Sequence, residues 1–203
     1  PDDHAGYYPG GETMTIKALF EKGTGKILGA QIVGGKGVDK RIDVFATAIF
    51  AGMTGSDLKD LDLAYAPPFS SAKDPVNMAG FMIENIVTGK VKQFYLKDLP
   101  ALPRDGSVTL LDVRTPEELV EDGYPEGFSL NIPVDELRER ISEVPAGKPV
   151  YVMCYSGLRS YVANRILAQN GFDSYNFTGG FRFYASVLSE MPMPGAHPCG
   201  LPK

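Results

Sequence analysis

The sequence has few of the residues that would build a disulfide framework or a metal centre. It contains two cysteines and two histidines in 203 residues. A small secreted domain held by disulfides would need four or more cysteines, so we expect a reducing, cytoplasmic compartment. His197 and Cys199 lie close together, but in a stretch rich in proline and glycine. We therefore expect no metal site.

Long apolar runs and an excess of positive charge are also missing. No run approaches the roughly 18–20 apolar residues that a membrane helix needs, which argues against a membrane protein. The formal net charge is -5, which argues against nucleic-acid partners and against binding at a membrane surface. The start at Pro1 has neither an initiator methionine nor the pattern of a signal peptide, which indicates a piece of a longer chain.

The residues that are present divide into two parts of different charge. Up to residue 97 there are 11 basic and 11 acidic residues, whereas the remainder has 9 basic and 14 acidic residues. Pro100, Pro103 and Gly106 lie in a polar stretch near this change, as is common in linkers. With 43% hydrophobic residues the chain can bury a core in each part. We predict one domain at residues 1–93 and a second at residues 94–203.

The first domain is expected to combine a hairpin with helices. Residues 13–20 and 27–33 have the pattern of two strands joined by a glycine turn. Apolar residues in 39–52 recur at helical spacing, and Asp74 is placed to cap a helix over 75–87. This predicts an α+β fold. The glycines of the hairpin have the wrong spacing and position for a dinucleotide-binding loop.

The second domain is expected to have an α/β fold with a parallel sheet covered by helices. Apolar segments at 108–113 and 149–153, and a short one around Tyr175, have the pattern of buried strands. Helical patterns lie between and after them, at 135–141, at 160–169 and after Gly180. Another helix is expected to begin after Thr115, where Glu118 can complete a capping box. Strands that alternate with helices in this way favour a parallel sheet.

Cys154 is the most informative residue, because it follows a buried strand and begins a loop that leads directly into a helix. Ligands bind at such loops in α/β sheets, where amide groups, the helix dipole and a nearby arginine stabilise a thiolate or another anion. Arg159 supplies that arginine. Four residues separate Cys154 from Arg159, whereas cysteine-dependent phosphatases use five. The shorter loop suits one transferred sulfur atom better than a tetrahedral phosphate.

The second domain strongly resembles the rhodanese family. The matching segments are residues 110–118 (LLDVRTPEE), 131–133 (NIP), 154–160 (CYSGLRS) and 176–180 (NFTGG). The resemblance implies that Cys154 accepts sulfur as a persulfide, that Arg159 orients the loop and attracts an anionic donor, and that Asp112 and Arg114 brace it. The residues expected to cradle the persulfide are Tyr155, Ser156, Gly157, Leu158 and Ser160.

The first domain resembles the carboxyl-terminal dimerisation domain of pyridine nucleotide–disulfide oxidoreductases. The matching segments are residues 6–10 (GYYPG), 26–34 (KILGAQIVG), 39–51 (DKRIDVFATAIFA), 62–70 (DLAYAPPFS) and 71–77 (SAKDPVN). The tyrosine-containing segments are similar to those of the coenzyme A (CoA)-disulfide reductase branch. A rhodanese domain fused behind them is typical of the fusion also described as an NADH-dependent persulfide reductase.

This second resemblance implies cofactors, partners and site residues. The family binds FAD and NAD(P)H in upstream domains, which are partners of this part in the full-length chain, and we expect this chain alone to bind no cofactor. It acts on CoA and small sulfur donors as a homodimer, here through residues 1–93. Tyr7 and Tyr65 would donate hydrogen bonds to sulfur in the active site of the partner subunit, with Tyr8 as the alternative to Tyr7. Lys73 is a candidate contact for a CoA phosphate.

Two other functions remain open from the sequence. One is an arsenate- or phosphate-handling cysteine enzyme on the same fold, which the short loop disfavours. The other is a dimerisation and persulfide-sensing module without catalysis, in which Cys154 stores sulfur and Cys199 resolves it.

Overall fold

The computed structural model describes residues 1–190 and divides into two compact units, Pro1–Lys90 and a unit that begins at Val91. The predicted boundary after residue 93 falls inside strand β3 (Lys92–Phe94). All three residues of β3 pair with strand β7 (Ser174–Phe177) of the second unit, so the chain changes unit three residues earlier than predicted. His197 and Cys199 lie outside the described residues.

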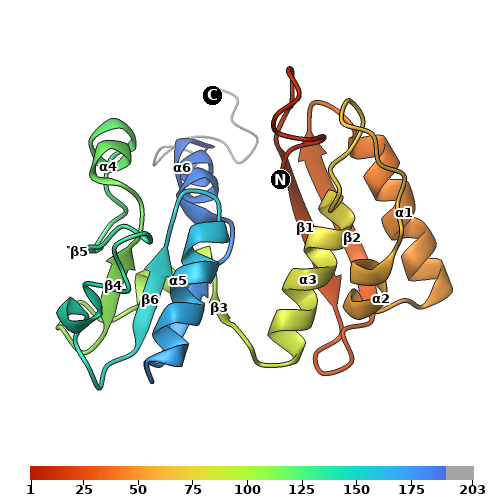
Figure 1. Cartoon of the computed structure of the whole chain (residues 1–203). Helices are drawn as coiled ribbons and strands as arrows, with labels where there is room; N and C mark the ends of the chain where they lie inside the picture. Colours follow the sequence, from red (N-terminus) through yellow and green to blue (C-terminus); the bar gives the residue numbers. More distant parts are fainter. Residues whose placement is uncertain (191–203) are drawn as a thin grey trace, which may run out of the picture. The chain divides into compact units, whose positions relative to one another are not determined.

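The first unit is built on an antiparallel hairpin of β1 (Met14–Phe20) and β2 (Ile27–Gly34). Helices α1 (Val38–Ala51) and α3 (Pro75–Val87) pack against β2 and β1, and the short helix α2 (Gly55–Asp60) packs against α3. Figure 1 shows the three helices beside the hairpin. Their shared core consists of Ile27, Phe45, Ala48, Leu58, Val76 and Ile83.

Capping residues set where two of these helices begin. The Asp74 carboxylate accepts a hydrogen bond from the Val76 amide, and Asn77 completes a capping box, so α3 has the predicted bounds. Thr54 and Asp57 form the same kind of box at α2. Helix α2 was not predicted from the sequence, although this Thr-x-x-Asp pattern could have indicated it.

The second unit contains a five-stranded, fully parallel sheet with the strand order β3-β7-β6-β4-β5. The remaining strands are β4 (Thr109–Asp112), β5 (Leu130–Asn131) and β6 (Val150–Met153). The helices are α4 (Pro116–Asp122), α5 (Leu158–Gln169), α6 (Gly180–Glu190) and the 3-10 helices η1 (Leu96–Ala101) and η2 (Ile141–Glu143). None of the helices within residues 1–190 combines the length and apolarity needed to cross a membrane.

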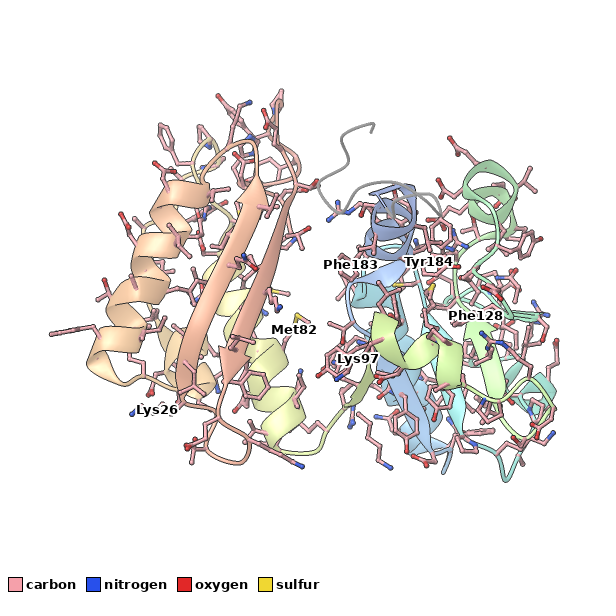
Figure 2. All side chains as sticks on the ribbon, turned by 180° about the vertical axis from the view of Figure 1, so that it is seen from behind. Lys26, Met82, Lys97, Phe128, Phe183 and Tyr184 are labelled. Atoms are coloured by element: carbon pink, nitrogen blue, oxygen red, sulfur yellow. The ribbon has the colours of Figure 1, made fainter. Side chains whose placement is uncertain are left out.

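Both faces of this sheet are covered, as predicted for a parallel sheet. On one face, Val150 and Val152 pack with Ala163, Ile166 and Leu167 of α5. On the other face, a second cluster contains Phe94, Leu99, Leu102, Leu110, Phe128, Met153, Phe177 and Phe181, with Tyr184 packed against it. Figure 2 labels Phe128 and Tyr184 in this second unit. Cys154 belongs to the α5 cluster, so the reactive loop is anchored directly in a core.

The predicted helix over residues 135–141 is wrong. This segment consists of turns followed by η2. Hydrogen bonds from the amides of Glu136 and Leu137 reach carbonyls only three residues back, as in a 3-10 turn rather than an α-helix. Within the segment only Leu137 is fully buried, and Ile141 is partly buried against the same core, whereas an α-helix would bury a repeated apolar face.

Candidate active site

Cys154 lies between the end of β6 and the start of α5, with its side chain fully buried. Its Sγ accepts a hydrogen bond from the Gly157 amide at 3.1 Å and another from the Ser160 hydroxyl at 3.3 Å. Burying a charged sulfur is costly unless donors replace the lost water. The two donors make this position suitable for a thiolate or for a sulfur anion attached to it.

The loop that follows Cys154 depends on glycines at two points. Gly157 has φ +103° and caps α5, a conformation that other residues rarely adopt. Gly180 has φ +69° and lies against the loop backbone, where a Cβ would be 2.7 Å from the Ser156 amide nitrogen. The amides of Phe181 and Arg182 then donate to the carbonyls of Cys154 and Tyr155 at 2.8 and 3.0 Å. The backbone at the start of α6 thus holds the Cys154 loop in place. Gly180 allows this close approach, and Gly157 allows the loop to turn into α5.

Arg159 is held by Glu118, which the sequence predicts only as part of a helix cap. Its guanidinium donates two hydrogen bonds to the Glu118 carboxylate, at 2.6 and 2.5 Å. These bonds lower the pKa of Glu118 to about 2 and raise the pKa of Arg159. Glu118 also accepts from the Thr115 amide at 2.9 Å, so it joins the first turns of α4 and α5. The partners are 41 residues apart, and no local pattern in the sequence indicates the pairing.

Asp112 and Arg114 form a buried ion pair behind the loop. The Arg114 side chain donates to the Asp112 carboxylate at 2.8 to 3.2 Å and to the Gly123 carbonyl at 2.9 Å. Its guanidinium carbon also lies 3.9 Å from the centre of the Phe181 ring, whose backbone amide binds the Cys154 carbonyl. The pair therefore connects β4 to the start of α6. This placement is compatible with a bracing role, which stays a prediction.

The first unit brings Tyr7 and Tyr65 together. Their hydroxyl oxygens lie 2.7 Å apart although the residues are 58 positions apart. Both phenols are exposed, and the hydrogen bond to Tyr65 raises the pKa of Tyr7. Tyr8 instead contacts the His4 ring edge-to-face, with 5.6 Å between ring centres. Of the two neighbouring tyrosines, Tyr7 is the one paired with Tyr65.

Lys73, the candidate CoA contact, lies on the loop that precedes α3. Its ammonium nitrogen is 5.0 Å from the centre of the Phe81 ring, a cation–π distance. The contact holds the side chain along α3. Whether it also meets a phosphate stays a prediction.

Each of the two units matches a different known protein family. Residues 1–76 match the family described as pyridine nucleotide-disulphide oxidoreductase, dimerisation domain, and residues 96–186 match the family described as rhodanese-like domain. The chain joins a dimerisation domain to a rhodanese-like domain. Both predicted fold classes are thereby confirmed, and the Cys154 loop lies inside the rhodanese-like match.

Two solved structures are similar to almost the whole of this chain. The chain is 50% identical to reduced CoADR-RHD from Bacillus anthracis, with a TM-score of 0.89 over 94% of this chain and 34% of that one. It is 41% identical to an NAD-dependent persulfide reductase from A. fulgidus, with a TM-score of 0.79 over 91% of this chain and 32% of that one.

Curated relatives match a shorter part of the chain. Coenzyme A disulfide reductase from Staphylococcus epidermidis is 45% identical over 78 residues, which is 38% of this chain and 18% of the relative. The corresponding protein from Staphylococcus haemolyticus is 42% identical over 83 residues, or 41% of this chain and 19% of the relative. The chain thus spans about a fifth of the length of these curated relatives and about a third of the related solved structures.

Proposed function

We propose that the rhodanese-like domain of this chain transfers sulfane sulfur through a persulfide on Cys154. The observation that carries the proposal is the pair of donors, the Gly157 amide and the Ser160 hydroxyl, directed at a buried sulfur. Donors fixed in a site that excludes water stabilise developing negative charge more strongly than water does. The sulfur anion of a persulfide is a charge that such a site can hold.

The transfer has two displacement steps that conserve electrons. The Cys154 thiolate attacks the outer sulfur of a donor such as thiosulfate, a sulfur–sulfur bond forms, and the donor's own bond breaks with its electron pair leaving on sulfite. A second thiolate then attacks the outer sulfur of the persulfide and leaves with it, which regenerates the Cys154 thiolate. The loop amides and Arg159 bind and orient the anionic donor, with Glu118 setting the direction of the guanidinium.

We further propose that the chain is the carboxyl-terminal part of a longer flavin-dependent CoA-disulfide or CoA-persulfide reductase. The similarity to reductases of about two to three times its length supports this. CoA would be the acceptor of sulfur from Cys154, and FAD with NAD(P)H would supply the reducing equivalents. The glycine stretch of this chain does not fit those cofactors, because Gly23 and Gly25 form the turn of a hairpin and Gly29 lies within β2. Other segments of the longer chain would bind them.

In that enzyme the dimerisation domain would complete the site of a partner subunit. Tyr7 and Tyr65, already joined by a hydrogen bond, would donate to the sulfur of CoA there, and Lys73 would contact a CoA phosphate. The dimer would form through the first domain, in keeping with the family that it matches.

A thiosulfate–cyanide assay on this chain tests the sulfur-transfer proposal. We expect thiocyanate formation by the wild type and its loss in Cys154→Ser, because the nucleophile is gone. Cys199→Ser, which removes the other thiol of the chain and leaves Cys154 in place, is the matched control and should keep most of the rate. Activity that persists in Cys154→Ser would contradict the proposal. A phosphatase activity that depends on Cys154 would favour the phosphate-handling alternative.

A further inference from the structure

The dimerisation domain contains a buried ion pair that lies outside the proposed chemistry. Arg41 on α1 and Asp74 at the start of α3 are each about 1% exposed. The Arg41 guanidinium donates to the Asp74 carboxylate through Nε at 3.1 Å and Nη2 at 2.9 Å. Although burial opposes it, hydrogen bonds from Arg41, Val76 and Ser70 hold the pKa of Asp74 below its usual range. The pair is therefore charged and rigidly held.

Arg41 uses its other donors on backbone carbonyls from three different segments. Nη2 donates to Asp3 at 2.5 Å and more weakly to Phe69 at 3.4 Å, and Nη1 donates to Gly37 at 3.1 Å. Gly37 has φ +64° and lies so close to Arg41 that a Cβ would collide with the guanidinium. One side chain thus joins the amino-terminal segment, the loop before α3 and the start of α1.

Asp74 also binds the loop that precedes α3. Its carboxylate accepts the Ser70 hydroxyl at 2.7 Å. The Ser70 carbonyl in turn accepts the Ala5 amide at 3.1 Å, and the Pro67 carbonyl accepts the same amide at 3.3 Å. The two segments that meet at the ion pair are therefore also bonded directly to each other.

These two segments carry the paired tyrosines. Tyr7 lies four residues after Asp3, and Tyr65 lies four residues before Phe69. The Ala5 carbonyl accepts a hydrogen bond from the Tyr8 amide, which closes a turn that contains Tyr7. The Ala66 carbonyl accepts hydrogen bonds from the amides of Phe69 and Ser70, which close a turn directly after Tyr65. Exposed side chains on separate loops lose much rotamer freedom when they are held together. Unless the backbone of both segments is held rigidly, a single exposed hydrogen bond is too weak to keep Tyr7 and Tyr65 together.

We propose that Arg41 and Asp74 are positioning residues that hold Tyr7 and Tyr65 at hydrogen-bond distance, so that the two phenols meet a sulfur substrate as one unit. The catalytic part of this statement rests on the proposed function. The positioning part concerns this chain alone. Arginine suits the position because its planar fork reaches a carboxylate and several carbonyls at once, which the single ammonium of lysine does not.

The titration of Tyr7 measures this positioning without any catalysis. We would label tyrosine at its hydroxyl-bearing ring carbon, follow the signals by nuclear magnetic resonance against pH, and assign them with Tyr7→Phe and Tyr65→Phe. In the wild type, Tyr7 should titrate above an ordinary phenol, and Tyr65→Phe should remove that shift. In Asp74→Asn and in Arg41→Lys, we expect the Tyr7 shift to be lost in the same way, while far-ultraviolet circular dichroism stays that of a folded chain.

Glu84→Gln is the matched control, because it breaks another ion pair of the same unit, Lys59–Glu84 at 3.1 Å, that does not contact either loop. It should leave the Tyr7 titration unchanged. If neither ion-pair variant folds, Ser70→Ala provides the test, because it removes only the hydroxyl that donates to the Asp74 carboxylate. We expect this variant to lose part of the Tyr7 pKa shift. A wild-type Tyr7 titration in the folded variants would overturn the proposal.

Turnover of the longer reductase separates this proposal from the proposed function. Arg41→Lys and Tyr65→Phe should each lower kcat about tenfold or more, and the double variant should lose no more than the single ones, because they remove the same interaction. If Tyr65→Phe leaves kcat unchanged while Arg41→Lys still alters the Tyr7 titration, the tyrosines are not catalytic and the positioning pair stands. If the titration is unaffected, the positioning pair fails whatever the kinetics show.

Discussion

At the scale of single residues, the most informative contact of the rhodanese-like domain is between Arg159 and Glu118. The family resemblance predicts that Arg159 orients the loop and attracts an anionic donor. In the structure its guanidinium is engaged by a carboxylate, so its charge is partly balanced and its direction is fixed. We infer that the loop amides carry more of the anion binding than the sequence suggests. Cys154 itself, its strand and its helix could be predicted, because all three are local features of the chain.

The Glu118 ion pair predicts a pH dependence of stability. The folded-state pKa of Glu118 is about 2, below the ordinary value for a glutamate. A carboxyl group whose pKa is lower in the folded than in the unfolded state stabilises the fold at pH values above its unfolded-state pKa. This contribution is lost as the pH falls toward its folded-state pKa. Glu118→Gln should therefore be less stable than the wild type at neutral pH, and the difference should shrink from about pH 5 down to about pH 2.

Urea unfolding over this pH range measures that difference. Glu121→Gln, an exposed position on the same helix, is the control and should show a much smaller effect. A Glu118→Gln deficit that stays constant down to the lowest pH would contradict the assigned ion pair.

At the scale of elements, the sequence predicts what depends on neighbouring residues and misses what depends on distant ones. Helix α3 has its predicted bounds because Asp74 and Pro75 encode its start. The segment 135–141 was predicted as a helix, but it packs against the core only through the buried Leu137 and the partly buried Ile141, which do not make a helical apolar face. Likewise, the packing of α6 against the Cys154 loop gives no periodic pattern in the sequence, and only a family resemblance points to the glycines involved.

That packing gives a prediction for Gly180. Gly180→Ala should destabilise the rhodanese-like domain by about 3 kcal/mol, because a left-handed conformation and a clash with the loop backbone act together. Gly147→Ala shares the positive φ but has open space around its Cβ, so it should cost only about 1 kcal/mol. Chemical denaturation measures both values. Equal losses would show that the close contact with the loop is unimportant; we expect sulfur transfer to fall in Gly180→Ala alone.

For the molecule as a whole, we predict a homodimer formed through the first domain. The hairpin packs its inner face on the helices, whereas Leu19 and Val33 stand on its outer face, 55% and 73% exposed. Because this domain matches a dimerisation-domain family, we place the expected interface at this outer face. We expect Val33→Lys to weaken self-association about tenfold or more, since it would bury a charge.

Sedimentation equilibrium measures this association. Val120→Lys is the control: Val120 is 83% exposed in the rhodanese-like domain and should not affect the dimer. Wild-type chain that stays monomeric at high concentration would contradict a dimer formed by these residues alone.

We propose that Cys154 carries sulfur, and the intact mass of the chain after treatment with polysulfide is the sharpest test of this. We predict a gain of about 32 Da, one sulfur atom on a reactive thiolate, in the wild type and in Cys199→Ser. Cys154→Ser should show no such gain. The absence of a gain in the wild type, or an equal gain in Cys154→Ser, would contradict the account.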